Sequence, residues 1–197
     1  GLTDFSHPCQ VLADLMTVRE YKGQLDGLKM CFIGDGNNML NSLTVGGLKM
    51  GMKVSAACPE GYEPAKEVLD FASGNPDFFL THNPQEAIEG ADVVVTDVWA
   101  SMGMESEKKE RKKAFAGYQV NAENLALAAG DAVVLHCLTA HRGEEITEEV
   151  FEGHAAEIFE EAENRLHAQK AVLVTLLGGQ IRTKKNIACI KNPPAAG

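Results

Sequence analysis

Most of the side chains in this sequence that could do chemistry fall in five short stretches. These stretches are His7-Pro8-Cys9-Gln10, Gly34-Asp35-Gly36-Asn37-Asn38, Asp97-Val98-Trp99-Ala100-Ser101-Met102-Gly103, Leu135-His136-Cys137-Leu138-Thr139 and Glu163-Asn164-Arg165. Their imidazole, amide, carboxylate, thiol and guanidinium groups can bind amines and oxyanions and can stabilise charge that develops on a carbonyl oxygen. The ligand spacings typical of structural zinc are missing, so we expect no metal site.

The first stretch predicts the start of a helix. Pro8 suits a first helical position, and apolar residues recur at helical spacing after it. The spacing between His7 and Gln10 places both side chains on one face, together with Asp14. A histidine at this position is often only a capping or surface residue, and that interpretation stays open. The functional alternative is an imidazole and an amide that together polarise a carbonyl group.

The order of the apolar segments predicts the fold. Near-continuous apolar runs lie at residues 28–33, 53–57, 78–81, 93–98 and 132–138. Segments with helical spacing lie between them, at residues 39–50, 62–72, 84–89, 105–115 and 122–129. Buried strands that alternate with helices are typical of a parallel sheet covered on both faces. We therefore expect an α/β fold, a doubly wound (Rossmann-like) parallel sheet of about five strands flanked by helices.

This fold predicts where the candidate residues meet, because ligands of such sheets bind beyond the carboxyl ends of the strands. Three of the stretches directly follow predicted strands. We therefore expect Asn38, Asp97, Ser101 and Cys137 to share one pocket. The alternatives are structural, since an acid at a strand end is often a cap and a thiol there is often a packed hydrophobe. Trp99 and Ser101 are harder to explain by packing alone. The charged residues 105–113 predict a solvated helix without a chemical role.

The glycine-rich stretch after the first strand admits another interpretation, a dinucleotide site at a helix start. Two features argue against it. The third glycine position is Met39, and the end of the second strand, Ala56-Ala57-Cys58-Pro59, lacks the acid that would hold a ribose. The stretch then predicts a tight turn capped by Asn37 or Asn38, whose amides could hold a substrate carboxylate.

Composition narrows the class of protein. The chain has 197 residues, 45% of them hydrophobic, so it can bury the core of one domain. A net charge of −10 argues against a nucleic acid partner, because phosphate binding needs a basic surface. Neither a membrane span nor a signal peptide is apparent, so we expect a cytoplasmic protein. The 5 cysteines are widely spaced, which favours reduced thiols.

Taken in this order, the five stretches resemble the ornithine carbamoyltransferases. The resemblance covers essentially the whole chain and corresponds to the carboxyl-terminal, ornithine-binding half of the family's enzymes. It implies carbamoyl transfer from carbamoyl phosphate to L-ornithine, which gives L-citrulline and phosphate in arginine metabolism. It also implies small-molecule substrates, no cofactor, and a homotrimer for the intact enzyme.

The resemblance implies roles for individual residues. His7, Gln10 and Arg165 would bind carbamoyl phosphate, since a guanidinium matches its oxygens in a fork that lysine lacks. We expect Arg165 to lie at the start of a helix. An arginine there is otherwise most often an exposed first-turn residue.

The resemblance also implies which residues bind ornithine. The residues that would hold ornithine are Asn38, Asp97, Ser101 and Met102. Asp97 would pair with an ammonium group of the substrate. Cys137 and Leu138 would guide the attacking amine, and the catalytic set would be Cys137, Asp97 and His7.

The sequence departs from the family pattern at two points. The family has proline where this chain has Thr139, and its cis peptide bond there costs about 2.5 to 4 kcal/mol without proline. The Ser-x-Arg-Thr-Arg loop of the family's amino-terminal carbamoyl phosphate domain has no match here. We therefore expect residues 1–197 to form a single ornithine-binding domain, inactive alone. It would have interdomain-type helices over 1–23 and 160–180 and a tail over 191–197.

Two other functions stay open. One is a non-catalytic module that binds an amino acid or another protein, which the missing loop favours. The other is a carbamoyltransferase for a different amine, such as putrescine or aspartate. Within the family resemblance, Ser101-Met102-Gly103 favours ornithine over these alternatives.

The resemblance also predicts that the two terminal helices have lost part of their usual cover. The apolar residues concerned are Val11, Leu15 and Met16 in the first helix and Val172, Leu176 and Leu177 in the last. We expect these helices to expose apolar surface, and therefore to pack on each other or to drive self-association.

Overall fold

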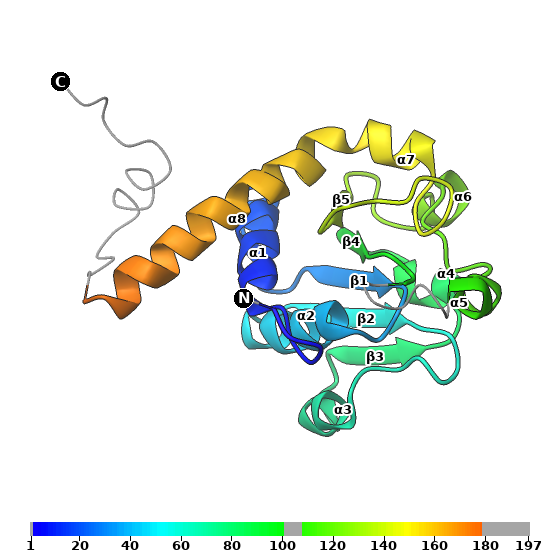
Figure 1. Ribbon diagram of the computed structural model, residues 1–197, viewed down its shortest axis with the longest axis horizontal. Coiled ribbons are helices and arrows are strands. Elements are labelled where there is room, and N and C mark those ends of the chain that lie inside the picture. The colour runs from blue at the N-terminus through cyan, green and yellow to red at the C-terminus, as the bar shows by residue number, and fades with distance from the viewer. Residues whose placement is uncertain (1, 101–107, 179–197) are drawn as a thin grey trace.

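The computed structural model of this chain describes residues 2–100 and 108–178. Its sheet has the strand order β3-β2-β1-β4-β5, and every neighbouring pair is parallel. Helices cover both faces (Figure 1). The expected doubly wound α/β fold is confirmed. Within the described ranges, no helix combines the length and apolarity needed to cross a membrane.

The elements follow the expected alternation of strand and helix. The strands are β1 (Lys29–Ile33), β2 (Lys53–Ala57), β3 (Phe78–Thr81), β4 (Val93–Thr96) and β5 (Val133–His136). The helices are α1 (Pro8–Lys22), α2 (Asn38–Lys49), α3 (Lys66–Ala72), α4 (Pro84–Ile88), α5 (Lys108–Ala114), α6 (Ala122–Leu125), α7 (Glu148–Gly153) and α8 (Ala155–Leu176). Strands β2 and β3 have the expected bounds, and the others differ by at most two residues at either end.

Successive side chains of each strand point to opposite faces of the sheet, which divides the core into two layers. Met30 and Phe32 of β1 belong to the layer packed under α1 and α2. Cys31 and Ile33 of the same strand belong to the layer packed under α4 and α7. Because both faces of the strands are buried, the strands appear in the sequence as continuous apolar runs.

The carboxyl-terminal helices differ from their expected form. Helix α8 is 22 residues long and begins at Ala155. The expectation that Arg165 lies at a helix start is therefore wrong, because Arg165 lies in the middle of α8. The first half of α8 lacks a clear apolar stripe, since its buried residues include Glu157 and Glu161. Helix α7 is too short for a periodic pattern and was absent from the expected elements.

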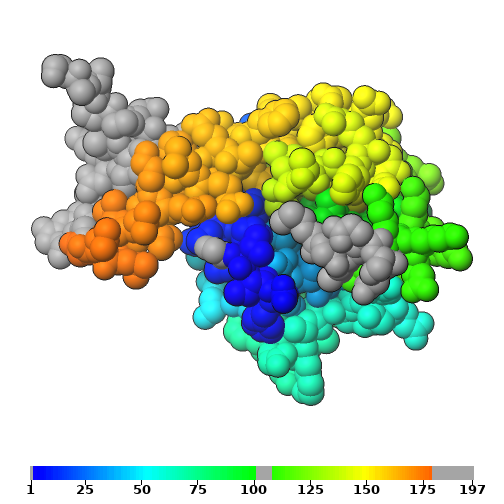
Figure 2. Space-filling model, viewed as in Figure 1, coloured from blue at the N-terminus to red at the C-terminus, as the bar shows by residue number. Residues whose placement is uncertain are grey.

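Helices α1 and α8 pack against each other. Val11 and Leu15 of α1 are buried in the core layer with α2, so the expectation that they are exposed is wrong. Leu176 and Leu177 are 76% and 85% exposed, as expected. The end of α8 that carries them extends beyond the body of the domain (Figure 1, Figure 2). Exposed apolar residues also occur earlier in both helices, at Leu12 of α1 and at Phe159 and Leu166 of α8.

The turn between β1 and α2 requires glycine at position 36. A Cβ at Gly36 would lie 2.2 Å from the carbonyl carbon of Glu63 and 2.4 Å from the nitrogen of Pro64. The Gly36 amide donates a hydrogen bond to the Tyr62 carbonyl oxygen at 2.8 Å. This close approach fixes the turn after β1 to the segment after β2, at the carboxyl edge of the sheet.

We expect Gly36→Ala to lower the free energy of unfolding by about 1 to 3 kcal/mol, because backbone must move to admit the new methyl group. Urea unfolding would measure the change. Gly153→Ala is the matched control, since no atom lies within 4 Å of a Cβ there. Equal unfolding midpoints for the two variants would contradict this account.

Candidate functional site

Asp97 is the centre of a hydrogen-bonded cluster at the carboxyl edge of the sheet. It directly follows β4 and is buried. One carboxylate oxygen accepts hydrogen bonds from the Cys137 thiol at 3.1 Å and from the Val98 amide at 2.8 Å. The other accepts from the side-chain amide of Asn37 at 2.8 Å. The segments after β1, β4 and β5 therefore meet at this carboxylate.

The structure selects Asn37 rather than Asn38 as the amide beside Asp97. Asn37 is the N-cap of α2, where its oxygen accepts from the Met39 amide at 2.9 Å while its nitrogen reaches Asp97. Asn38 is already in the helix, and its side chain donates to the Thr3 carbonyl oxygen at 2.7 Å. The structure thus gives Asn38 no hydrogen bond to Asp97 among the described residues, and its contact with a substrate stays a prediction.

Two further residues expected in this pocket, Ser101 and Met102, lie outside the described residues.

Gln10 connects α1 to α8. Its amide nitrogen donates to Asp14 at 2.9 Å and to Glu161 at 2.7 Å, and its amide oxygen accepts from the Arg165 guanidinium. The structure therefore brings Gln10 and Arg165 together, although 155 positions separate them. Gln10 is only 1% exposed, and both N–H groups of its amide are committed to these two acids.

His7 is held at the same end of α1. Its backbone amide donates to the Ser42 hydroxyl at 2.8 Å. Burial, followed by the positive charge of Arg165, lowers the pKa of His7, whereas the negative charge of Asp97 raises it. The net direction favours a neutral imidazole at physiological pH. Among the residues that the structure describes, none forms a hydrogen bond with its buried Nδ1, so this atom can serve a ligand.

The Cys137 thiol stays protonated. Burial, then the negative charge of Asp97, raises its pKa well above the ordinary value, and Glu161 and Asp14 add to the effect. A protonated thiol is a poor nucleophile, because the thiolate is the reactive form. Cys137 can therefore donate a hydrogen bond and contact an amine, but its environment does not favour covalent catalysis.

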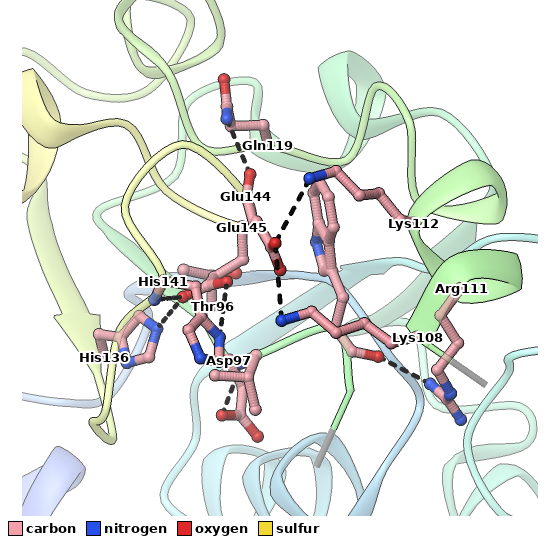
Figure 3. Close-up of polar contacts among 12 residues, drawn as sticks. Thr96, Asp97, Lys108, Arg111, Lys112, Gln119, His136, His141, Glu144 and Glu145 are labelled. Atoms are coloured by element: carbon pink, nitrogen blue, oxygen red, sulfur yellow. Dashed lines mark hydrogen bonds and ion pairs between the residues drawn. The ribbon is translucent and has the colours of Figure 1, made fainter. Parts of the chain in front are cut away.

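A buried histidine and glutamate hold the segment after β5. The Leu138 amide donates to Nδ1 of His136 at 2.9 Å, so the ring proton lies on Nε2, which donates to Glu145 at 3.0 Å (Figure 3). Glu145 also accepts from the His141 backbone amide at 2.5 Å. Leu138 has a left-handed φ of 55°, and its peptide bond to Thr139 is cis. The histidine thus fixes the backbone that carries Leu138.

Arg111 attaches α5 to the same edge of the sheet. Its guanidinium donates to the Asp35 carboxylate at 2.7 Å and to the Trp99 carbonyl oxygen at 2.9 Å. The expectation of a solvated helix is wrong at Arg111, which is buried. Trp99 is buried as well, and its ring stacks on Phe115 with centroids 6.0 Å apart. Packing therefore explains Trp99, contrary to the expectation.

One neighbouring group has the composition of a metal site. Ligand atoms of His141, Glu144 and Glu145 lie within 4.8 Å of one another. Glu144 already pairs with Lys112 at 3.4 Å and with Lys108 at 3.9 Å, while Glu145 holds the turn described above (Figure 3). Lysines of the chain itself balance Glu144, and Glu145 is committed to His136 and the His141 backbone amide, so we assign no metal to them.

The sequence reasoning missed most of the residues that support the site. Asp14 was placed on the correct helix face but without a role, and Glu161 was missed. A signal was present in the spacing, because Asp14 follows Gln10 by four residues and Glu161 precedes Arg165 by four. Each acid therefore lies one helical turn from a candidate residue, on the same face.

A polar carboxyl edge on a doubly wound parallel sheet defines the class of protein, a small-molecule-binding α/β domain. Residues 26–176 match the family described as aspartate/ornithine carbamoyltransferase, Asp/Orn binding domain. The match covers more than half of the chain, which therefore belongs to the aspartate/ornithine carbamoyltransferase family.

The relatives similar in sequence are ornithine carbamoyltransferases. The chain is 56% identical over 183 residues to that of Carboxydothermus hydrogenoformans and 52% identical over 184 residues to that of Pyrococcus horikoshii. These alignments cover 90% and 91% of this chain but only 59% and 58% of the relatives. The chain thus spans less than two thirds of their length.

Solved structures similar to this chain belong to transcarbamylases as well. The ornithine carbamoyltransferase of Pyrococcus furiosus is 49% identical with a TM-score of 0.84, over 91% of this chain and 59% of that one. An N-acetyl-L-ornithine transcarbamylase is less similar, at 30% identity and a TM-score of 0.73, over 87% of this chain and 57% of that one.

The buried acids make stability depend on pH. Burial raises the pKa of Asp14 from 3.8 to about 6. Between these values the folded chain keeps a proton that the unfolded chain has lost. The free energy of unfolding is therefore highest below the ordinary pKa and falls as the pH rises through the raised one.

We expect Asp14→Asn to reduce this fall by on the order of 3 kcal/mol, the equivalent of about two pKa units. Urea unfolding at a series of pH values would measure it. Asp77→Asn is the control, because Asp77 is exposed. A variant that loses stability with pH as steeply as the parent would refute the assignment.

Proposed function

We propose that this chain is the ornithine-binding part of an ornithine carbamoyltransferase, which makes L-citrulline and phosphate from L-ornithine and carbamoyl phosphate. The observation that carries the proposal is the meeting of Asp97, Asn37 and Cys137 at the carboxyl edge, beside the Gln10 and Arg165 pair. Family membership and the names of the relatives support it.

On the ornithine side, Asp97 would bind the ammonium group of the amino acid. Its carboxylate is oriented by the Val98 amide, Asn37 and Cys137, so it needs little reorganisation on binding. The neutral thiol of Cys137 would lie against the δ-amine and leave that amine as the nucleophile. The Leu138 carbonyl would accept a hydrogen bond from the same amine. Ser101 and Met102 would hold the amino acid end.

On the carbamoyl phosphate side, Arg165 and His7 would contact the phosphate and the carbonyl oxygen. Gln10 orients Arg165, and its amide oxygen keeps a second lone pair for the carbamoyl nitrogen. The amine nitrogen bonds to the carbonyl carbon, the bond to the phosphate oxygen breaks, and the amine proton leaves with phosphate or to solvent. Catalysis of this kind is mostly juxtaposition and oxyanion stabilisation.

The whole enzyme's activity and assembly are part of the proposal, because the chain spans about 59% of the relatives' length. The partners would be the two small-molecule substrates, and the intact enzyme would be a cytoplasmic homotrimer. The phosphate-gripping Ser-x-Arg-Thr-Arg loop has no match in this sequence.

We expect the 197-residue chain to bind L-ornithine and Asp97→Asn to weaken binding about tenfold to a hundredfold, since one charge-assisted hydrogen bond contributes about 1.5 to 3 kcal/mol. Isothermal titration calorimetry would measure it. Asp77→Asn makes the same charge change on the surface and should bind as the parent does. Tighter binding of putrescine or L-aspartate than of L-ornithine would sink the proposal.

We also expect the purified chain to form citrulline far more slowly than an intact enzyme. Losing the groups that orient one reactant forfeits much of the roughly 7 to 11 kcal/mol that positioning can provide. A colorimetric citrulline assay with both substrates would test this. Turnover at rates typical of enzymes would show that the missing loop is dispensable.

A further inference from the structure

Two buried carboxyl groups lie behind the site without a role in the proposed chemistry. Asp14 of α1 and Glu161 of α8 are both 0% exposed. Each accepts a hydrogen bond from the Gln10 amide nitrogen, and Glu161 also accepts from the His136 backbone amide at 2.9 Å. The two acids thus join α1, α8 and the end of β5, the elements that carry Gln10, Arg165 and Cys137.

The two carboxyl groups accept hydrogen bonds from the same amide nitrogen, at 2.9 and 2.7 Å, so their oxygens lie close together. Oδ2 of Asp14 is buried and has no hydrogen-bond partner among the described residues, so it can share a proton with Glu161. Burial raises the pKa of both, and Asp14 raises that of Glu161 further, so Glu161 is the acid that keeps the proton. Two carboxylates this close in a buried site cannot both be ionised.

Charge balance supports the same arrangement. Arg165 is the positive group that acts on Asp14, while Cys137 and His7 are neutral at physiological pH and Asp97 is bound by its own donors. One ionised carboxylate in the pair then balances one guanidinium. With two, the pair would carry one more negative charge than Arg165 can balance.

We infer that Asp14 and Glu161 share one proton and act as a positioning pair, which turns the Gln10 amide so that its nitrogen faces inward and its oxygen holds Arg165. The inference rests on the proposed function only for the role of Arg165 toward phosphate. With the amide reversed, its nitrogen would face the guanidinium donor and its oxygen would face the two acids, so its present hydrogen bonds to Asp14, Glu161 and Arg165 would all be lost.

The proton can be observed without a ligand. Infrared spectra of the 197-residue chain at neutral pH should contain a carboxylic acid C=O band that shifts in deuterium oxide and disappears in Glu161→Gln. Glu157→Gln is the matched control, one turn away on α8, because Glu157 is bound to His154. Carbon-13 labelling of glutamate in the parent chain gives the same answer by NMR, even if a variant fails to fold.

The orientation of Gln10 can be followed by NMR. The quantity to measure is the rate at which its side-chain amide protons exchange with water. Glu161→Gln should leave that exchange slow, since the new amide can still donate to Asp14. Asp14→Ala removes the acceptor and should speed the exchange at least tenfold.

Two results would contradict the shared proton and its positioning role: a parent chain without the acid band, or an Asp14→Ala variant with unchanged exchange. Neither measurement uses a ligand, so a failure of carbamoyl phosphate to bind would count only against the proposed function.

Discussion

The parallel direction of all the strands is the constraint on which this domain depends. Their carboxyl ends meet at one edge, so the polar residues that follow separate strands must meet there too. That edge is largely buried, and buried polar groups require partners. Asp97 is stabilised by three donors, and His136 by a glutamate and a backbone amide. The need to satisfy these groups is what organises the site.

A second requirement joins the helices to this edge. Helices α1 and α8 cross over the sheet, and the contact between them is polar at Gln10, Arg165 and the two buried acids. An apolar interface would hold two helices together as well. A hydrogen-bonded interface also fixes their rotation, because each donor must face its acceptor. The orientation of Arg165 is therefore set by Gln10, which the two buried acids hold in turn.

The sheet and the meeting of Asp97 with Cys137 could be predicted from the sequence, because continuous apolar strands and residues at strand ends carry a strong local signal. The supporting residues could not. Glu161 and Arg111 are charged residues in highly charged helices, and only tertiary contacts distinguish them from a solvated surface. The choice between Asn37 and Asn38 depended on which residue caps α2, a boundary that spacing alone leaves uncertain by one position.

The protonated thiol of Cys137 has a consequence for the chemical durability of the site. Peroxides and disulfides attack thiolates, so a cysteine held neutral by burial and by a neighbouring carboxylate is oxidised slowly. Under the proposed function, the site can thus place a soft, polarisable atom beside the reactive amine without becoming sensitive to oxidative damage. A cysteine with a lower pKa in the same place would also make the site respond to oxidants.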